Sequence, residues 1–429
     1  MKNLIVSAEQ NGVLVPVGSI SGRNNADACF RYSDEYRKRS GIPVSISLPM
    51  QEAPFTAEQT ANFFEGLLPE GFTRRTVAQW MHVDEWDYLS ILHILGRECL
   101  GALCITEAEE GLEASYERIA ESKIRELAAE GAVKSAELVT EAHLSLTGAS
   151  GKVGLYYYEP QVAWYLPAGT APSTHIVKQS HVRLDAVVTN ERLSMMTAER
   201  CGLDVPKNFI INTGKGGEHE VLFASRRYDR LFGADCPFVS GLPRPYRLHQ
   251  EDLAQAMGIP AAAKYERDND RYLKGMFDVL RKHSADPVSD QLKLWDIVVF
   301  NFLIGNTDAH IKNFSLLYGK DMRSIRLAPA YDIISTAIYE QSTRKMAFHI
   351  GEAVYLDELT RDSFRQAADE IGLGEKMAMR RFDAMAYRFR HALHESTEAL
   401  LKEGFSKASE IEERILQTAG IRTAARQHR

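Results

Sequence analysis

The stretch that decides the fold of this chain is Asn306-Thr307-Asp308-Ala309-His310-Ile311-Lys312-Asn313-Phe314-Ser315. It places an aspartate and an asparagine five positions apart, and another aspartate follows in Tyr331-Asp332. Transfer of the γ-phosphate of ATP uses these groups in this order. Asp308 could accept the proton of an attacking hydroxyl, and Asn313 and Asp332 could hold Mg²⁺ on the phosphates. The Asp-x4-Asn spacing is common by chance, so its meaning depends on the residues upstream.

The bulk properties are those of an ordinary globular protein. The chain has 429 residues, which suggests two to four domains at about 150 residues each. It is 45% hydrophobic and 25% charged, with a net charge of −7, so it lacks the overall positive field of a nucleic-acid-binding protein. No run approaches about 18 uncharged apolar residues, and a charge appears too early for a signal peptide. We therefore expect a cytoplasmic protein without membrane contact.

The five cysteines are scattered through apolar stretches. No Cys-x-x-Cys occurs, and no histidine stands at ligand spacing from a cysteine. We expect small, apolar core residues in a reducing compartment.

Residues 1–108 are predicted to form a small α/β domain. Asn11-Gly12 is typical of a two-residue hairpin turn. The alternation of apolar and polar residues over 43–49 predicts a half-buried strand. Thr56 and Gln59 are spaced as a capping box at the start of a helix.

The rest of the chain is divided by composition. Residues 109–144 are rich in Ala and Glu with helical periodicity, which predicts a connector of short amphipathic helices. Residues 145–245 carry strand patterns and one helix at about 188–202, and they are predicted to form a β-rich N-lobe. Residues 246–429 read as a helical C-lobe, in which an apolar helix at 295–304 leads into the 306–315 motif.

Two upstream features could contact phosphates. The small-residue loop Ser145-Leu146-Thr147-Gly148-Ala149-Ser150-Gly151-Lys152 could bring the backbone N–H groups of Ser150, Gly151 and Lys152 close to an anion. Lys178 ends an apolar strand, where a kinase places a point charge for the α- and β-phosphates. A strand-end lysine that faces solvent is the alternative.

Two further features complete the order. Glu191 could pair with Lys178, or it could be a first-turn residue that complements a helix dipole. The run Arg226-Arg227-Tyr228-Asp229-Arg230 could be a linker between lobes, where the backbone at Arg226 and Tyr228 binds adenine and Asp229 reaches the ribose. As a charged run it could equally be a solvated edge. The order of these features along the chain is that of a kinase: the loop, the lysine, the glutamate, the linker, the Asp-x4-Asn motif and the last aspartate. We therefore predict an α+β, two-lobed protein-kinase-like fold preceded by the small N-terminal domain.

The chain resembles the HipA-like serine/threonine kinases, the toxins of bacterial toxin–antitoxin modules. The resemblance covers nearly the whole chain, and its most specific parts are the Gln-Glu-Asp, Lys-Tyr-Glu and Thr-Asp-x-His-x-Lys-Asn-Phe-Ser signatures. The segments that carry it are Phe63-Phe64-Glu65-Gly66-Leu67-Leu68-Pro69-Glu70, 145–152, Thr174-His175-Ile176-Val177-Lys178, Arg227-Tyr228-Asp229-Arg230, Arg247-Leu248-His249-Gln250-Glu251-Asp252, Lys264-Tyr265-Glu266, 306–315 and Ala328-Pro329-Ala330-Tyr331-Asp332-Ile333.

The resemblance implies ATP and Mg²⁺ as cofactors. It implies Asp308 as the catalytic base, Asn313 and Asp332 as Mg²⁺ ligands, and Lys178 on the nucleotide phosphates. His310, Lys312 and Asn313 belong to the same signature and would line the nucleotide site.

The resemblance also implies regulation and partners. Family members autophosphorylate a serine in the Gly-rich loop, the position that Ser145 occupies here, with Thr147 and Ser150 as alternative hydroxyls. The family phosphorylates translation proteins, notably aminoacyl-tRNA synthetases. It pairs with a helix-turn-helix antitoxin, HipB-like, through which contact with DNA is indirect. Two residues depart from the family pattern: Ser150 replaces a common Gln, and Arg226 replaces a common Glu.

Two other functions fit the same residues. One is a catalytically idle pseudokinase that acts as a corepressor with the antitoxin, although no required catalytic residue is missing. The other is a small-molecule phosphotransferase related to the aminoglycoside phosphotransferases. The N-terminal domain and the Gln250-Glu251-Asp252 motif argue against the second.

Overall fold

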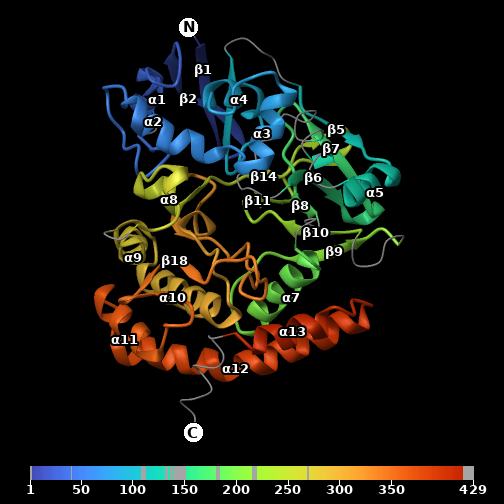
Figure 1. Cartoon of the computed structure of the whole chain (residues 1–429). Helices are drawn as coiled ribbons and strands as arrows, with labels where there is room; N and C mark the ends of the chain where they lie inside the picture. The colour runs from blue at the N-terminus through green and yellow to red at the C-terminus, as the bar shows by residue number, and fades with distance from the viewer. Residues whose placement is uncertain are drawn as a thin grey trace. The chain divides into compact units, whose positions relative to one another are not determined.

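A computed structural model describes the chain in residues 2–39, 41–107, 113–130, 134–135, 138, 151–179, 184–214, 220–267 and 270–418 (Figure 1). The chain forms two compact units. The first is made of Met1–Val182, Ile211–Ala261 and Leu316–Ile325, and the second of Arg183–Ile210, Ala262–Ser315 and Arg326–Arg429. The predicted N-terminal domain and the sheet of the predicted N-lobe thus share one unit, so the predicted boundaries at 108 and 145 do not separate the units.

The first unit opens with an antiparallel sheet in the order β3-β2-β1-β4. Its strands are β1 (Lys2–Gln10), β2 (Val13–Gly22), β3 (Cys29–Tyr32) and β4 (Leu103–Glu107). Gln10 pairs with Val13, and the two residues between them, Asn11 and Gly12, both have positive φ, 50° and 84°. This is the geometry of a two-residue hairpin turn, so the predicted turn is confirmed.

Four α-helices lie between β3 and β4 in the sequence and belong to the same unit (Figure 1). They are α1 (Asp34–Arg39), α2 (Ala57–Phe64), α3 (Gly71–Trp80) and α4 (Tyr88–Leu95), and a 3₁₀ turn, Glu65–Leu67, follows α2. At the start of α2, Gln59 N donates to Thr56 Oγ1 at 3.1 Å and Thr56 N donates to Gln59 Oε1 at 3.1 Å. The predicted capping box is therefore confirmed.

The strand predicted over 43–49 is wrong. Only one isolated bridge forms there, between Ser45 and Leu48, and the segment turns back on itself. Ser45 Oγ accepts from Ser47 N at 3.1 Å, a local bond that competes with a strand ladder. Pro43 and Pro49 lack the N–H that a ladder would use.

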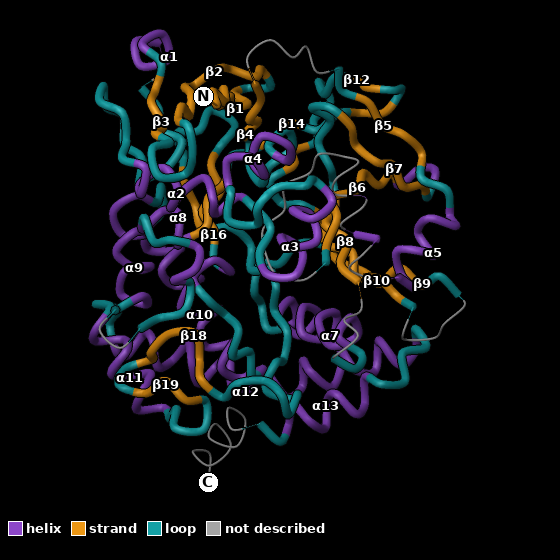
Figure 2. Tube along the Cα trace, turned by 45° about the horizontal axis from the view of Figure 1, so that its top comes forward, coloured by secondary structure: helices purple, strands orange, loops and turns teal. Residues whose placement is uncertain are grey.

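The second sheet of the first unit has six strands in the order β5-β7-β6-β8-β10-β9 (Figure 2). The strands are β5 (Ser115–Arg118), β6 (Lys152–Tyr158), β7 (Ala163–Ala168), β8 (His175–Gln179), β9 (Asn208–Asn212) and β10 (Val221–Arg226), with a 3₁₀ turn at Glu159–Gln161. Strands β9 and β10 are neighbours at one edge of this sheet.

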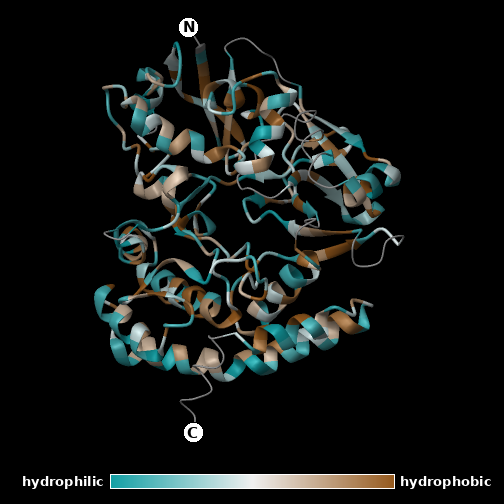
Figure 3. Ribbon diagram, in the orientation of Figure 1, coloured by the Kyte–Doolittle hydropathy of each residue, from teal (hydrophilic) through white to brown (hydrophobic). Residues whose placement is uncertain are grey.

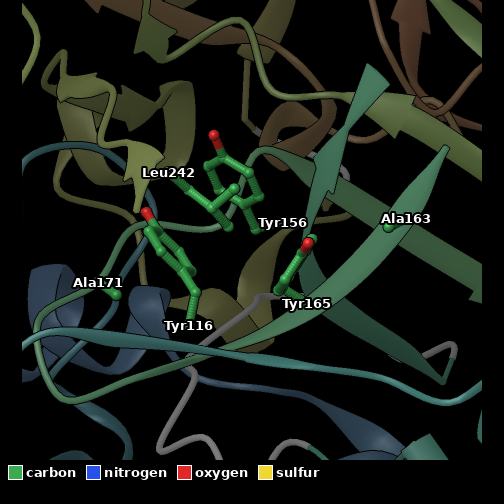
Figure 4. Packing of buried hydrophobic residues seen from close by; sticks show 6 residues of the cluster. All are labelled: Tyr116, Tyr156, Ala163, Tyr165, Ala171 and Leu242. Atoms are coloured by element: carbon green, nitrogen blue, oxygen red, sulfur yellow. The ribbon is translucent and has the colours of Figure 1, made fainter. Parts of the chain in front are cut away.

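The connector prediction was only partly right. Helix α5 (Glu121–Glu130) forms as expected, but residues 115–118 form the edge strand β5. The cause is an aromatic cluster in which Tyr116, Tyr156 and Leu242 lie against one another (Figure 4). The Tyr116 and Tyr156 rings are 4.4 Å apart between centroids, and the Tyr116 hydroxyl donates to the Pro172 carbonyl at 2.9 Å. A buried tyrosine that finds an acceptor stabilises the edge position.

Short elements make up the rest of the first unit, and some of them extend into the ranges of the second. They are β11 (Arg230–Leu231) paired with β14 (Tyr246–Arg247), β12 (Phe238–Val239) paired with β13 (Leu242–Pro243), then β15 (Gln250–Asp252), α8 (Leu253–Met257), the 3₁₀ turn Ala261–Ala263 and β16 (Ser315–Tyr318). Strand β17 follows at Ile325–Leu327.

The second unit is mainly helical. Its helices are α7 (Val187–Arg200), α9 (Tyr272–His283), α10 (Pro287–Ile304), α11 (Arg361–Glu370), α12 (Glu375–Lys402) and α13 (Ala408–Leu416), with a hairpin of β18 (Lys345–Ile350) and β19 (Ala353–Tyr355). The helix predicted at 188–202 is α7, and the apolar helix before the motif is α10.

Helix α12 shows why this unit is stable. Hydrophilic and hydrophobic residues alternate along it (Figure 3), and its buried side chains, among them Phe382, Phe389 and Leu393, recur every three or four residues. Their face packs against α7 and α10. None of the described helices combines the length and the apolar character that crossing a bilayer requires.

Candidate active site

Helix α10 leads directly into the 306–315 motif. It begins with a capping bond from Ser289 N to Asp286 Oδ1 at 3.2 Å and ends at Gly305, which has φ 75°. A side chain at Gly305 would be strained by that φ and would lie 3.1 Å from Ala337 Cβ. The glycine therefore ends the helix and turns the chain into the motif.

Asp308 has a fixed main chain and an exposed side chain. The Asn306 side chain accepts from Asp308 N at 3.1 Å and donates to Asn301 Oδ1 at 2.8 Å. Thr307, between them, bonds the Thr336 hydroxyl at 2.8 Å. These contacts hold the predicted base at the end of α10 while its carboxylate reaches solvent.

Two hydrogen bonds fix the main chain and the side-chain amide of Asn313. It ends the 3₁₀ turn Ile311–Asn313, its N–H donates to the His310 carbonyl at 2.8 Å, and its Nδ2 donates to the Asp308 carbonyl at 3.0 Å. The amide nitrogen thus faces the chain, which leaves Oδ1 for a cation. Among the described residues, no hydrogen bond is recorded to that oxygen.

Asp332 lies close in the fold to the segment that carries Asn313, and Tyr331 is the reason. The Tyr331 hydroxyl donates to the Lys312 carbonyl at 2.9 Å and bonds the Ser315 hydroxyl at 2.6 Å, on either side of Asn313. Asp332 is half-buried and has φ 58°, a left-handed conformation that costs about 1–2 kcal/mol in most residues but is visited by Asp. Strain of this kind gathers at functional sites.

The donor atoms suit Mg²⁺. A carboxylate and an amide oxygen are hard ligands, and Mg²⁺ is commonly held by one or two such groups with phosphates and water. Within the described ranges, no cluster of three or more His, Cys, Asp or Glu side chains forms a separate metal site. The oxygens of Asn313 and Asp332 fit a Mg²⁺ ion that also takes phosphate and water ligands.

Helix α7 holds the loop that carries Asp332 through Asn190, a residue that no motif in the sequence marks out. Asn190 Nδ2 donates to the Ser335 carbonyl at 2.9 Å, and Asn190 Oδ1 accepts from Ser335 N at 3.2 Å. The next residue, Glu191, is 6% exposed and lies in the second turn of α7, so the first-turn dipole explanation for Glu191 is wrong. Its pairing with Lys178 stays a prediction.

His310 and Lys312 are more buried than a nucleotide-binding prediction would suggest. Their exposed fractions are 7% and 5%. The His310 N–H donates to the Asp308 carbonyl at 2.8 Å, and the Lys312 carbonyl is the acceptor for Tyr331. Both residues shape the motif, and contact between their side chains and a nucleotide stays a prediction.

The first unit presents paired lysines. Lys152 on β6 lies directly opposite Lys178 on β8, and Phe223 on β10 lies opposite Lys178 on the other side. Residues opposite one another in antiparallel strands share a face. Both ammonium groups therefore belong to one face of the sheet. Gly151 is buried next to Lys152, whereas Ser145, Thr147 and Ser150 lie outside the described residues.

The prediction that Asp229 reaches a ribose is wrong, and so is the alternative of a solvated edge. Asp229 is 2% exposed, and both of its oxygens are bonded: Arg227 Nε to Oδ1 at 2.9 Å, and Gly101 N to Oδ2 at 2.8 Å. The Tyr228 hydroxyl donates to Gln250 Oε1, and Arg226 lies 5.8 Å from the Phe232 ring centroid. Roles for Arg226 and Tyr228 at the nucleotide stay predictions.

Asp229 belongs to a buried ion cluster. Its members are Glu9, Glu98, Arg227, Asp229, Arg230, Arg244 and Arg247. Glu98 is its centre, at 3.0 Å from Arg227 Nη1 and 2.9 Å from Arg230 Nη2, and it also accepts from Ser173 N at 2.9 Å. Burial alone would raise the pKa of Glu98, but Arg230, Arg227 and Arg247 outweigh it and bring that pKa to about 2.

This cluster explains the unexpected unit boundary. Glu9 and Glu98 come from the predicted N-terminal domain, whereas the arginines come from residues 227–247 of the predicted N-lobe. Separating them would leave charges buried without partners, at a cost of several kcal/mol. No local sequence signal relates residues so far apart.

Known proteins of one family match this chain over most of its length. Residues 12–106 match the model of the HipA N-terminal domain, and residues 144–393 match that of the HipA-like C-terminal domain. A putative kinase, Y4mE, from Sinorhizobium fredii is 34% identical over 376 residues, which is 85% of this chain and 86% of that protein. The serine/threonine-protein kinase toxin HipA from Shewanella oneidensis is 25% identical over 398 residues, 88% of this chain and 86% of the toxin.

The solved structure of the Shewanella oneidensis HipA, HipB and operator DNA complex is similar in fold. It matches with a TM-score of 0.79 at 21% identity and covers 99% of this chain and 97% of the matched chain. The predicted class, an α+β protein with a kinase-like two-lobed fold, is confirmed. The chain belongs to the HipA family, as its resemblance indicated.

Proposed function

We propose that this protein is an ATP- and Mg²⁺-dependent serine/threonine protein kinase, the toxin of a toxin–antitoxin module. The observation that carries the proposal is the arrangement of Asp308, Asn313 and Asp332 in the second unit. An exposed carboxylate stands on a fixed loop, and the Tyr331 hydroxyl, next to Asp332 in sequence, bonds the residues on either side of Asn313. Membership of the HipA family supports the same chemistry.

In this proposal Asp308 accepts the proton of a serine or threonine hydroxyl as that oxygen attacks the γ-phosphorus. Asn313 and Asp332 would hold Mg²⁺, and Lys178 with Lys152 would neutralise phosphate charge. Bound Mg·ATP supplies the phosphoryl group and the ADP leaving group. Catalysis then rests on positioning and electrostatics, since the protein forms no covalent bond to the phosphate.

The partners are proposed from the relatives. The structural neighbour was solved with HipB and operator DNA, so we propose a HipB-like helix-turn-helix antitoxin as partner, with DNA bound only through it. The proposed substrate is a translation protein such as an aminoacyl-tRNA synthetase, as the family resemblance implies.

The test of the proposed function is self-phosphorylation. Purified protein, treated with phosphatase and then incubated with Mg·ATP, should gain one phosphate in its intact mass, and peptide mapping should place it on Ser145. Ser145→Ala should abolish that phosphate, unless Thr147 or Ser150 is the true site. If dephosphorylated wild type gains no phosphate and transfers none to a translation extract, a pseudokinase corepressor is favoured. Transfer to an aminoglycoside alone would favour a small-molecule phosphotransferase.

Asp332→Ala should lose Mg²⁺-dependent nucleotide binding. Without its carboxylate, the cation keeps only Asn313 and the phosphates, so the Kd for Mg·ATP should rise more than about tenfold. Isothermal titration calorimetry with and without Mg²⁺ measures this. Asp362→Ala is the control, because Asp362 pairs on the surface with Arg365 and should leave the Kd unchanged. An unaltered Kd in Asp332→Ala would remove this residue from the metal site.

A further inference from the structure

The Lys264-Tyr265-Glu266 motif carries no part of the proposed mechanism so far, yet it contacts the proposed base. The Tyr265 hydroxyl donates a hydrogen bond to Oδ1 of Asp308. A hydroxyl that donates to a carboxylate makes a charge-assisted bond, stronger than a bond between neutral groups. One of the two oxygens of Asp308 is therefore held by this tyrosine.

Glu266 fixes the backbone next to Tyr265. It is 5% exposed, and its own N–H donates to the Ala347 carbonyl on β18 at 2.8 Å. Its carboxylate accepts from Tyr272 N at 3.1 Å and from His349 N at 2.5 Å. A buried carboxylate with several N–H donors is a rigid anchor, so Tyr265 starts from a fixed position.

The ring of Tyr265 is also directed by its neighbours. It meets the His310 ring edge-to-face, at 5.3 Å between centroids and 88° between planes. Lys264 Nζ lies 5.5 Å from the Tyr265 ring centroid. His310 stands two residues after Asp308 and donates its N–H to the Asp308 carbonyl at 2.8 Å. The loop that carries His310 therefore positions both the Tyr265 ring and Asp308.

These contacts give the two oxygens of the Asp308 carboxylate different roles. A general base needs one oxygen for the acceptor hydroxyl, and its orientation is commonly set by a bond to the other oxygen. We propose that Tyr265, anchored by Glu266, is a positioning residue that holds Oδ1 of Asp308 and turns Oδ2 toward the acceptor hydroxyl. The inference rests on the proposed kinase function and adds to it a residue that never touches the substrate.

Tyr265→Phe is the decisive variant, because it removes the hydroxyl and keeps the ring against His310. We expect kcat for phosphate transfer to fall about tenfold to a hundredfold, as for the loss of one bond to a charged group, with KM for Mg·ATP unchanged. Tyr355→Phe is the matched control, since Tyr355 is 47% exposed and Tyr265 is 45% exposed. An unchanged kcat would overturn the proposal. A raised kcat would overturn it too and would show that the hydroxyl blocks the base.

A second measurement needs no kinase activity and separates this inference from the proposed function. In protein labelled with ¹³C at tyrosine Cζ, the resonance missing from Tyr265→Phe identifies Tyr265. That resonance should shift in Asp308→Asn, while the Tyr355 resonance should not. If the wild type transfers no phosphate but the shift occurs, the proposed function fails and the contact stands. If Tyr265 does not respond to Asp308→Asn, the positioning role fails whatever the activity.

Discussion

Asp308→Ala should reduce phosphate transfer by at least about 10²–10⁴-fold, the range that a general base contributes, and leave Mg·ATP binding nearly intact. The side chain is exposed, so its loss should leave no buried cavity. Asn313 and Asp332, the proposed cation ligands, are unchanged in this variant. Transfer is measured with labelled ATP at saturating nucleotide, and binding is measured separately by calorimetry.

Asp308→Asn refines this expectation. The amide oxygen of Asn can still accept from Tyr265, but without the negative charge that strengthens the bond to the carboxylate. The side chain can no longer take up a proton, so the variant should be as inactive as Asp308→Ala. Asp278→Ala is the surface control, because Asp278 pairs with exposed neighbours on α9. Transfer at near wild-type rate by either Asp308 variant would rule out this residue as the base.

Glu98→Gln should destabilise the first unit by about 3–5 kcal/mol, the usual cost of removing one partner from a buried ion pair. Glu98 is 1% exposed and has Arg227, Arg230 and Arg247 around it. With a neutral side chain there, the buried arginines lose their central counter-charge. The expected readout is a clearly lower urea midpoint for the unfolding of this unit.

The matched control is Glu35→Gln. Glu35 pairs with Arg39 at 2.9 Å, but both side chains are at least 70% exposed, so the expected loss is below about 1 kcal/mol. Equal effects of the two substitutions would contradict a central role for Glu98.

The pH dependence gives an independent check on Glu98. Its pKa in the folded protein is about 2, below the ordinary 4.5. The stabilising contribution of Glu98 is therefore complete above about pH 4.5 and is lost as the pH falls toward 2. Wild type should lose more stability than Glu98→Gln over that range.

The sequence by itself determined the features that depend on neighbouring residues. The Asn11-Gly12 turn, the Thr56 capping box and helix α10 each follow from local backbone preferences or hydrophobic periodicity. The order of the small-residue loop, Lys178, Glu191 and the Asp308 motif led to the kinase-like class, because that order can be read from the sequence alone. The family signatures identified the HipA family, because each is a short run of residues that can be recognised without the structure.

Only the tertiary structure decided the features that depend on burial and on distant partners. The charged run at 226–230 is locally indistinguishable from a linker or a solvated edge, and Glu98 makes it part of a buried cluster. Residues 115–118 become a strand through the partner strand β7 and the Tyr116 cluster. Tyr265 and Tyr331 gain their proposed roles through hydroxyl contacts with residues that local pattern does not relate to them. Local pattern encodes turns and periodicity, whereas the free energy of a buried charge or hydroxyl depends on partners that only the folded chain supplies.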